Sequence, residues 1–278
     1  MSASDLGKKL QNIPRWVTAM ITIILIVIPL SYPLNIPVKV TGDVIDFYNY
    51  IQELPEGSVV ALGFDHLGAG HWASTGAACI ATVNLILQRP LKLIIWSTNS
   101  QGAALFPELL KRITIPEDKK YGVDWVYFGF ISGEEAAMAE LAYNLRSSGV
   151  DYYGNALNKL PVMEGIYDHE QVDLLINNGG GGTWPKFYVR KWVSPYGTPF
   201  AMIQTPVNSI MNLPFRASGH IKWVIWGQLG DAELETLLGY SGWGRSNIDA
   251  QNLIHLFVIV MVILGNVGYQ LERKGRGV

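Results

Sequence analysis

Polar side chains and glycines follow several short apolar segments in the middle of the chain. The candidates for binding a small ligand are Asp65, His66, Asn99, Ser100, Gly180, Gly181 and Gln204. Carboxylate, imidazole, amide and hydroxyl groups can all bind a polar ligand, and glycines let it approach the backbone closely. If the apolar segments are parallel strands, their carboxyl ends meet at one edge of a sheet, where the ligands of such folds bind. The pattern therefore predicts a ligand crevice at that edge.

The four consecutive glycines at residues 179–182 are the most distinctive part of this set. Successive backbone N–H groups in such a run can form a concave site for an anion. No Lys-Ser/Thr pair follows the run, so it is not a P-loop, and the glycine spacing of a dinucleotide site with its acidic partner is also missing. An anion site and a flexible turn remain the two interpretations of this run.

The sequence predicts no catalytic residues, no metal site and no cofactor. Asp65, His66 and His71 offer one carboxylate and two imidazoles, but a spacing of five does not place the two histidines on one helical face. Ser100 and Ser132 follow apolar segments without the Gly-x-Ser-x-Gly pattern of a hydrolase nucleophile. A hydrolase is the third hypothesis, and Asp65 is its most plausible residue.

The elements that would position these residues alternate between apolar strands and amphipathic helices. Strands are predicted at residues 58–64, 91–96, 123–130, 172–176, 199–204 and 221–226. Helices are predicted at residues 43–53, 71–87, 103–113, 133–146, 184–193 and 231–238, with Asp231 near the start of the last one. Strands that are apolar on both faces and separated by helices are typical of a doubly wound, mostly parallel open sheet of the Rossmann-like α/β class.

Each end of the chain carries an apolar run that is long enough to cross a membrane. Residues 253–271 are interrupted only by His255, Asn266 and Gln270, and 19 helical residues extend about 28 Å, close to the ~30 Å of a bilayer core. A second run occupies residues 16–34. We therefore divide the chain into an N-terminus (1–15), a first span (16–36), an α/β domain (37–250), a second span (251–271) and a basic tail (272–278).

The charges predict which side of the membrane each part occupies. Residues 1–15 and 272–278 each carry a net charge of +2, so the remainder carries −6 of the total of −2. Because basic flanks stay in the cytoplasm, both termini are predicted to be cytoplasmic and the domain extracytoplasmic. An acidic domain without a basic stripe argues against nucleic acid as a partner. A single cysteine, Cys79, excludes an intrachain disulfide.

Several short motifs resemble a known family. They are Leu54-Pro55-Glu56-Gly57-Ser58, Gln101-Gly102-Ala103, Asp151-Tyr152-Tyr153-Gly154, Leu160-Pro161-Val162-Met163 and Asp249-Ala250-Gln251-Asn252. The chain is similar along nearly its whole length to prokaryotic membrane-anchored proteins with an N-terminal helix, an α/β domain and a C-terminal helix, whose function is uncharacterised. The resemblance implies the fold and the anchoring, and it implies no site residues. Where relatives have Tyr-Asp-Pro after Phe-Asp, this chain has His66-Leu67-Gly68.

Two functions follow from these features. The first is a non-enzymatic, membrane-anchored subunit of a larger membrane assembly, which is homo-oligomeric and structural or scaffolding, with other membrane proteins as partners. Two of the nine tryptophans, Trp184 and Trp243, are candidates for its interfaces. The alternative is an extracytoplasmic small-ligand-binding or sensing domain that uses the carboxyl ends of the strands.

Overall fold

A computed structural model describes residues 3–179 and 181–275. The chain divides into two compact units. The anchor unit combines Met1–Pro37 with Ser241–Val278, and the α/β unit is Val38–Tyr240. We describe each unit separately.

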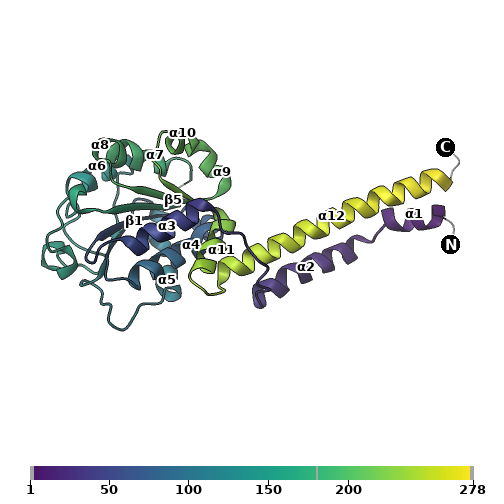
Figure 1. The fold of residues 1–278 in the computed structure, drawn as a ribbon, viewed down its shortest axis with the longest axis horizontal. Helices are drawn as coiled ribbons and strands as arrows, with labels where there is room; N and C mark the ends of the chain where they lie inside the picture. The colour runs from purple at the N-terminus through teal and green to yellow at the C-terminus, as the bar shows by residue number, and fades with distance from the viewer. Residues whose placement is uncertain (1–2, 180, 276–278) are drawn as a thin grey trace. The chain divides into compact units, whose positions relative to one another are not determined.

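The α/β unit is built on one six-stranded parallel sheet (Figure 1). Its strands are β1 (Val59–Asp65), β2 (Lys92–Ser97), β3 (Trp125–Phe130), β4 (Leu174–Gly179), β5 (Phe200–Gln204) and β6 (Trp223–Trp226). They lie in the order β3-β2-β1-β4-β5-β6, and every neighbouring pair is parallel. The prediction of a parallel, Rossmann-like α/β sheet is confirmed. The strands are apolar because both faces of the sheet are covered.

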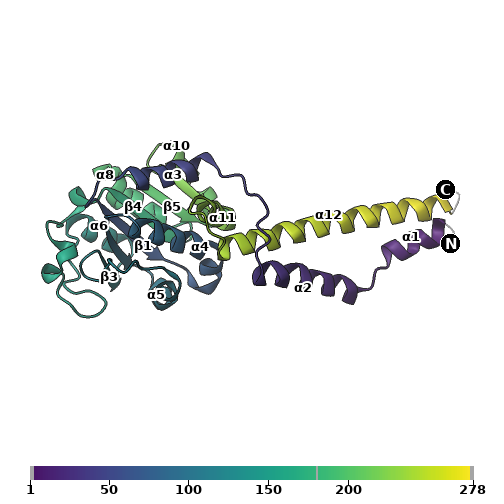
Figure 2. The same ribbon diagram turned by 60° about the horizontal axis from the view of Figure 1, so that its bottom comes forward.

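The helices of this unit cover both faces of the sheet (Figure 2). They are α3 (Gly42–Glu53), α4 (Gly68–Leu87), α5 (Ser100–Arg112), α6 (Glu135–Tyr143), α7 (Trp184–Tyr188), α8 (Ser194–Tyr196), α9 (Pro206–Ser209), α10 (Leu213–Ala217) and α11 (Gly227–Leu237). α4 packs against α5 and α11, whereas α6 and α7 pack together with the π-helical turn Val189–Val193. The side chains of that second group form a large apolar cluster with β1 to β6, in which Trp96 and Trp192 stack at 5.8 Å between ring centroids.

Two helices begin earlier than the sequence predicted. α4 begins at Gly68 instead of residue 71, so its first turn contains two glycines that carry no helix signal. α5 begins at Ser100 instead of residue 103, because the Asn99 side chain accepts the Gln101 N–H at 2.8 Å and caps the helix. Both shifts bring the start of a helix next to the end of a strand.

The prediction for Asp231 was wrong. α11 begins at Gly227, whose φ of +48° allows a tight turn out of β6, so Asp231 lies inside the helix and not near its start. The carboxylate is fully buried, and it accepts the Ala78 N–H of α4 at 2.9 Å. Its role is therefore to join two helices.

The anchor unit contains α1 (Ala3–Gln11), α2 (Arg15–Ser31) and α12 (Trp243–Gly275). α12 has a segment, Trp243–Lys274, that is long and apolar enough to cross a membrane. α2 has only 17 residues. It reaches the length and apolar character of a membrane span only when it is taken together with α1, and the two helices are bent by 54° relative to one another. The predicted second span is therefore supported by its own helix, whereas the first span is not.

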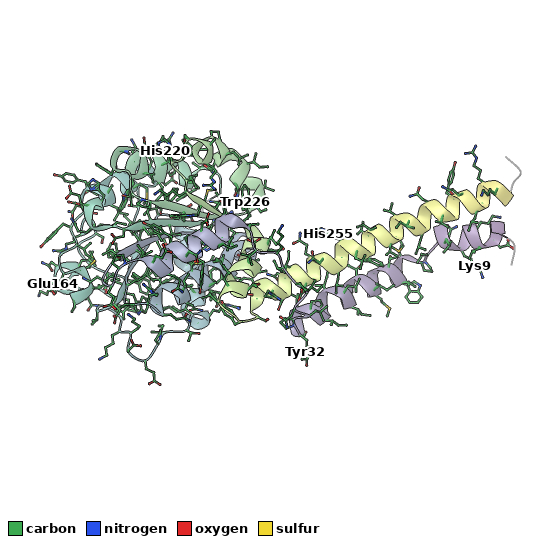
Figure 3. The ribbon with its side chains drawn as sticks, viewed as in Figure 1. Lys9, Tyr32, Glu164, His220, Trp226 and His255 are labelled. Atoms are coloured by element: carbon green, nitrogen blue, oxygen red, sulfur yellow. The ribbon has the colours of Figure 1, made fainter. Side chains whose placement is uncertain are left out.

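α1 and α2 lie alongside α12 and run in the opposite direction to it (Figure 1). A Cβ atom on Gly7 of α1 would lie 2.6 Å from the Gly268 carbonyl oxygen of α12, and Gln11 donates to Glu272 at 2.8 Å. Lys9 and Tyr32 lie at opposite ends of the α1–α2 segment (Figure 3). The beginning of the chain therefore packs beside the end of α12.

Candidate ligand-binding site

The order of the strands reverses between β1 and β4. The chain proceeds from β1 through β2 to β3 on one side and then crosses back to β4 on the other side. Asp65 ends β1 and pairs in register with Gly179, which ends β4. Open α/β sheets bind ligands in the crevice outside such a switch point. The predicted residues Asp65, His66 and Gly181 meet here, and Gly180 lies outside the described residues.

Asp65 lies at this switch point, and both of its carboxylate oxygens accept hydrogen bonds. Oδ1 accepts the Thr98 N–H at 2.6 Å and the Thr98 hydroxyl at 2.9 Å. Oδ2 accepts the Asn177 amide at 3.0 Å and the Tyr188 hydroxyl at 2.6 Å. Burial raises the pKa of the carboxyl group to about 6, although the four donors favour the charged form. Asp65 thus joins three strands to α7 and positions the residues around it.

Two indoles extend this buried network. Trp96 of β2 donates to the Tyr188 hydroxyl at 3.0 Å, and Trp184 donates to the Thr98 hydroxyl at 2.9 Å. Sequence analysis missed Tyr188 because it lies far from Asp65 along the chain. One signal was present: Gly63, inside β1, leaves the space that the Tyr188 hydroxyl fills.

His66 is fully buried, and neither of its ring nitrogens has a hydrogen-bond partner among the described residues. Its ring centroid lies 4.7 Å from that of Phe64 and 5.1 Å from that of Trp72. Burial first, and then the neighbouring His71, lowers the pKa of His66 to about 3. The imidazole is therefore neutral at pH 7, and its single N–H has no acceptor in the described part of the chain.

His71 lies beside His66 in the first turn of α4, with 6.3 Å between the ring centroids. The Asn208 amide lies 2.9 Å from Nε2 of His71 and donates to it, which places the imidazole proton on Nδ1. Nδ1 is buried and also lacks a partner within the described part of the chain. Burial lowers the pKa of His71 as well. Two neutral imidazoles thus present N–H groups without acceptors at one place.

Side-chain amides hold the carbonyl oxygens of the glycine run. Gln204 of β5 donates to the oxygens of Gly179 and Gly181, the latter at 2.8 Å. Asn212 donates to the Gly182 oxygen at 3.3 Å. In a trans peptide the N–H of one residue points away from the carbonyl group of the residue before it. The N–H groups of Gly182 and Thr183 therefore point away from the Gln204 and Asn212 side chains.

The segment after β5 lies against this run. A Cβ atom on Gly181 would lie 2.9 Å from Leu67 and 4.0 Å from the Asn208 amide, and Gly182 lies against Met211. Sequence analysis predicted no helix here and missed Asn208 and Asn212. The signal that it could have used is Pro206, a residue favoured at the first position of a helix such as α9.

Buried polar atoms without partners concentrate at this edge of the sheet. Half of those found among the described residues belong to His66, His71, Asn177, Asn178, Gln204 and Asn212. The amide nitrogens of the last four donate to protein acceptors, which leaves the four amide oxygens as open acceptors. Such concentrations call for bound water or a ligand.

The remaining predicted residues follow β2. Asn99 uses its oxygen to cap α5, and Ser100 is the first residue of that helix. Both lie at the same edge of the sheet as Asp65, because β2 is parallel to β1. The cap gives Asn99 a structural role beside its predicted one.

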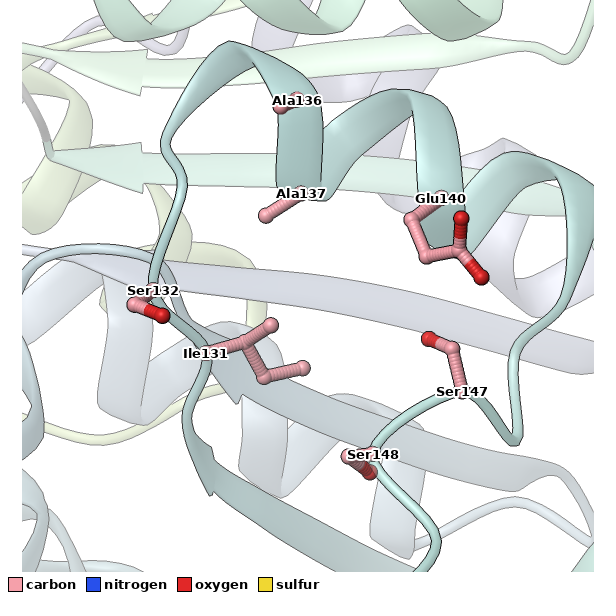
Figure 4. Close-up of a pocket in the computed structure, with 7 residues that line it drawn as sticks. All are labelled: Ile131, Ser132, Ala136, Ala137, Glu140, Ser147 and Ser148. Atoms are coloured by element: carbon pink, nitrogen blue, oxygen red, sulfur yellow. The ribbon is translucent and has the colours of Figure 1, made fainter.

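A separate cavity of about 360 Å³ lies after β3 (Figure 4). Its lining residues are Ile131, Ser132, Ala136, Ala137, Glu140, Ser147 and Ser148. The side chains of Glu140 and Ser147 point toward one another across it (Figure 4). Of these residues, sequence analysis singled out only Ser132.

Comparison of the chain with protein-family models, curated proteins and solved structures gives no match. In the described part of the chain, no cluster of three or more His, Cys, Asp or Glu side chains could hold a metal ion.

Proposed function

We propose that this protein is a membrane-anchored, non-enzymatic binding protein whose α/β unit holds a small polar ligand at the carboxyl ends of β1 and β4. The observation that carries the proposal is His66, which is fully buried at the switch point with neither ring nitrogen hydrogen-bonded to a described residue. Features that break a local rule without compensation concentrate at functional sites.

The energetic cost of His66 supports this proposal. A buried polar group without a partner costs about 1–3 kcal/mol. A phenylalanine ring would fill the same space between Phe64 and Trp72 without that cost. The imidazole therefore weakens the fold, and a ligand that uses its N–H accounts for its presence.

The test is the melting temperature of the full-length protein in detergent during a metabolite screen. A ligand that binds the folded state at 100 times its Kd stabilises it by about 2.7 kcal/mol. His66→Phe should melt at or above the wild-type temperature and lose the ligand-induced rise. Ala136→Leu, which fills the cavity after β3, should keep that rise.

Two results would contradict the proposal. One is a screen in which no compound raises the melting temperature. The other is a rise that Ala136→Leu abolishes and His66→Phe preserves, which would move the ligand to the cavity after β3.

A second proposal, a homo-oligomeric subunit of a membrane assembly, rests on an exposed apolar surface of the α/β unit. Val207, Ile210, Met211 and Leu213 follow β5 and are 78%, 64%, 52% and 44% exposed. Contiguous exposed apolar side chains mark interaction surfaces. Light scattering of the detergent-solubilised protein should give a multiple of the chain mass, and Val207→Lys combined with Ile210→Lys should reduce it. A monomer at micromolar concentration would rule this proposal out.

We also propose that both termini are cytoplasmic and that the α/β unit is extracytoplasmic. The packing of Gly7 against Gly268 supports this topology because it brings the two basic ends of the chain together within the anchor unit. Protease added to sealed spheroplasts should digest the α/β unit and spare both tails. A C-terminal tag that is accessible from outside, with the α/β unit protected, would reverse the topology.

A further inference from the structure

We infer that the first turn of α4, together with His66 and His71, binds a phosphate group, either as free phosphate or as a phosphomonoester such as a lipid headgroup carries. The inference rests on the ligand site proposed above and names the class of its ligand.

The first observation is the uncapped start of α4. This helix has 20 residues, its preceding residue Leu67 makes no side-chain capping bond, and its first turn contains no acidic residue. The first N–H groups of a helix have no partner within it, and with the helix dipole they form an anion site. Gly70 leaves one side of this helix start open, because a Cβ atom on it would have no neighbour within 4 Å, whereas a Cβ atom on Gly68 would lie 2.9 Å from the Gln101 side-chain oxygen.

The second observation is independent of the helix and comes from the two imidazoles. His66 is fully buried without a partner, and Nδ1 of His71 carries a proton without an acceptor among the described residues. His71 belongs to the first turn of α4, and the His66 ring centroid lies 6.3 Å from that of His71. Their unused donors require an acceptor, and they add to the donors of the helix.

The glycine run lies close to these groups, since a Cβ atom on Gly179 would lie 2.8 Å from the His66 Cα atom. Asn208 joins the two parts, because its amide contacts His71 and would lie 4.0 Å from a Cβ atom on Gly181. Gln204 and Asn212 donate to the carbonyl oxygens of Gly181 and Gly182. The N–H groups of the next residues, Gly182 and Thr183, therefore point away from these two side chains. Donors thus come from α4 and from both imidazoles, and the glycine run lies beside them. A tetrahedral phosphate, with several acceptor oxygens, suits such a set better than a planar carboxylate does.

The nearest carboxylate does not oppose the anion directly. Each oxygen of Asp65 accepts two hydrogen bonds, from Thr98, Asn177 and Tyr188. These donors face the carboxylate and reduce its effect on the crevice.

The test compares inorganic phosphate and glycerol 3-phosphate with acetate and glycerol, by calorimetry and by melting temperature, on the full-length protein in detergent. Both phosphate compounds should bind, whereas acetate and glycerol should not. Glycerol 3-phosphate binding at least tenfold more tightly than inorganic phosphate would assign the site to a phosphomonoester, and equal affinities would assign it to the free anion.

Gly70→Asp is the decisive variant, and Gly70→Ala is its matched control. Both side chains enter open space at a backbone conformation that suits any residue. The new carboxylate should preserve or raise the melting temperature through the helix dipole and weaken phosphate binding at least tenfold. The control should bind phosphate within about threefold of the wild type.

Failure of the inference can be distinguished from failure of the site. If neither phosphate compound binds at millimolar concentration, or if Gly70→Asp binds them as the wild type does, the inference is overturned. The proposed ligand site would still be supported in that case if a neutral metabolite stabilised the wild-type protein and did not stabilise His66→Phe. If neither a phosphate compound nor any metabolite of the screen binds, both the phosphate inference and the proposed ligand site are contradicted.

Discussion

At the scale of residues, His66 gives the α/β unit a pH dependence of its own. The pKa of its imidazole is about 3 in the folded chain and about 6.5 in the unfolded chain, so the unfolded state binds more protons between these values. His66 therefore lowers the stability as the pH falls below about 6.5. Asp65, with a folded pKa of about 6 against 3.8, raises the stability as the pH falls from about 6 toward 3.8. The two residues oppose one another in this range.

Replacing His66 by phenylalanine should remove the group that lowers the stability of the folded chain below pH 6.5. The variant should gain stability over the wild type by about 1.4 kcal/mol for each pH unit below 6.5. Melting temperatures at pH 7, 6 and 5 measure the gain, with His220→Phe as the control. A stability difference that does not change with pH would show that the His66 imidazole binds a proton equally well in the folded and unfolded chains.

Tyr188→Phe tests the buried hydrogen-bond network that joins Asp65, Tyr188 and Trp96. The variant removes one donor from Asp65 and leaves the Trp96 indole N–H without its acceptor. We expect a loss of about 3 kcal/mol at pH 8. The loss should shrink at pH 5, where Asp65 is largely neutral, because its folded pKa is about 6. Equal losses at both pH values would contradict a charged Asp65.

At the scale of elements, the strands could be predicted from the sequence more readily than the starts of the helices. The strands are buried on both faces, so their apolar runs are unambiguous, as in β1. α4 and α11 begin at glycines, which carry no helix signal, and α5 begins at Ser100, directly after its cap residue Asn99. The position of Asp65 and Gly181 at one edge followed from strand order. The partners of Asp65 did not, because only tertiary packing brings Tyr188 and Thr98 to it.

The contact between α1 and α12 can be tested with two glycines of the same helix. A Cβ atom on Gly268 would lie 2.9 Å from the Gly7 carbonyl oxygen, whereas one on Gly265 would have no neighbour within 4 Å. Gly268→Leu should therefore separate α1 from α12 and expose it to limited proteolysis in detergent. Gly265→Leu should leave the cleavage rate of α1 unchanged. Equal rates in the two variants would show that the contact does not hold α1.

At the scale of the whole molecule, Cys79 offers a single reporter of unfolding. The thiol is fully buried in α4, and burial followed by the charge of Asp231 raises its pKa well above the usual range. A thiol reagent should therefore react only when the α/β unit opens. The labelling rate in urea should follow the loss of tryptophan fluorescence. Rapid labelling under native conditions would indicate a local opening of α4.

The anchor unit also determines the order in which the chain can fold. Asp249 accepts the backbone N–H groups of Asn35 and Ile36 at 2.9 and 3.2 Å, and α1 packs on the last turns of α12, so both early segments depend on the end of the chain. A ribosome that adds 5–20 residues per second needs roughly 10–50 s to reach that end after Pro37 has been made. During this interval the first helices lack their partner while the α/β unit is completed. The edge of the sheet that carries Asp65 and His66 can therefore form before the anchor unit is complete.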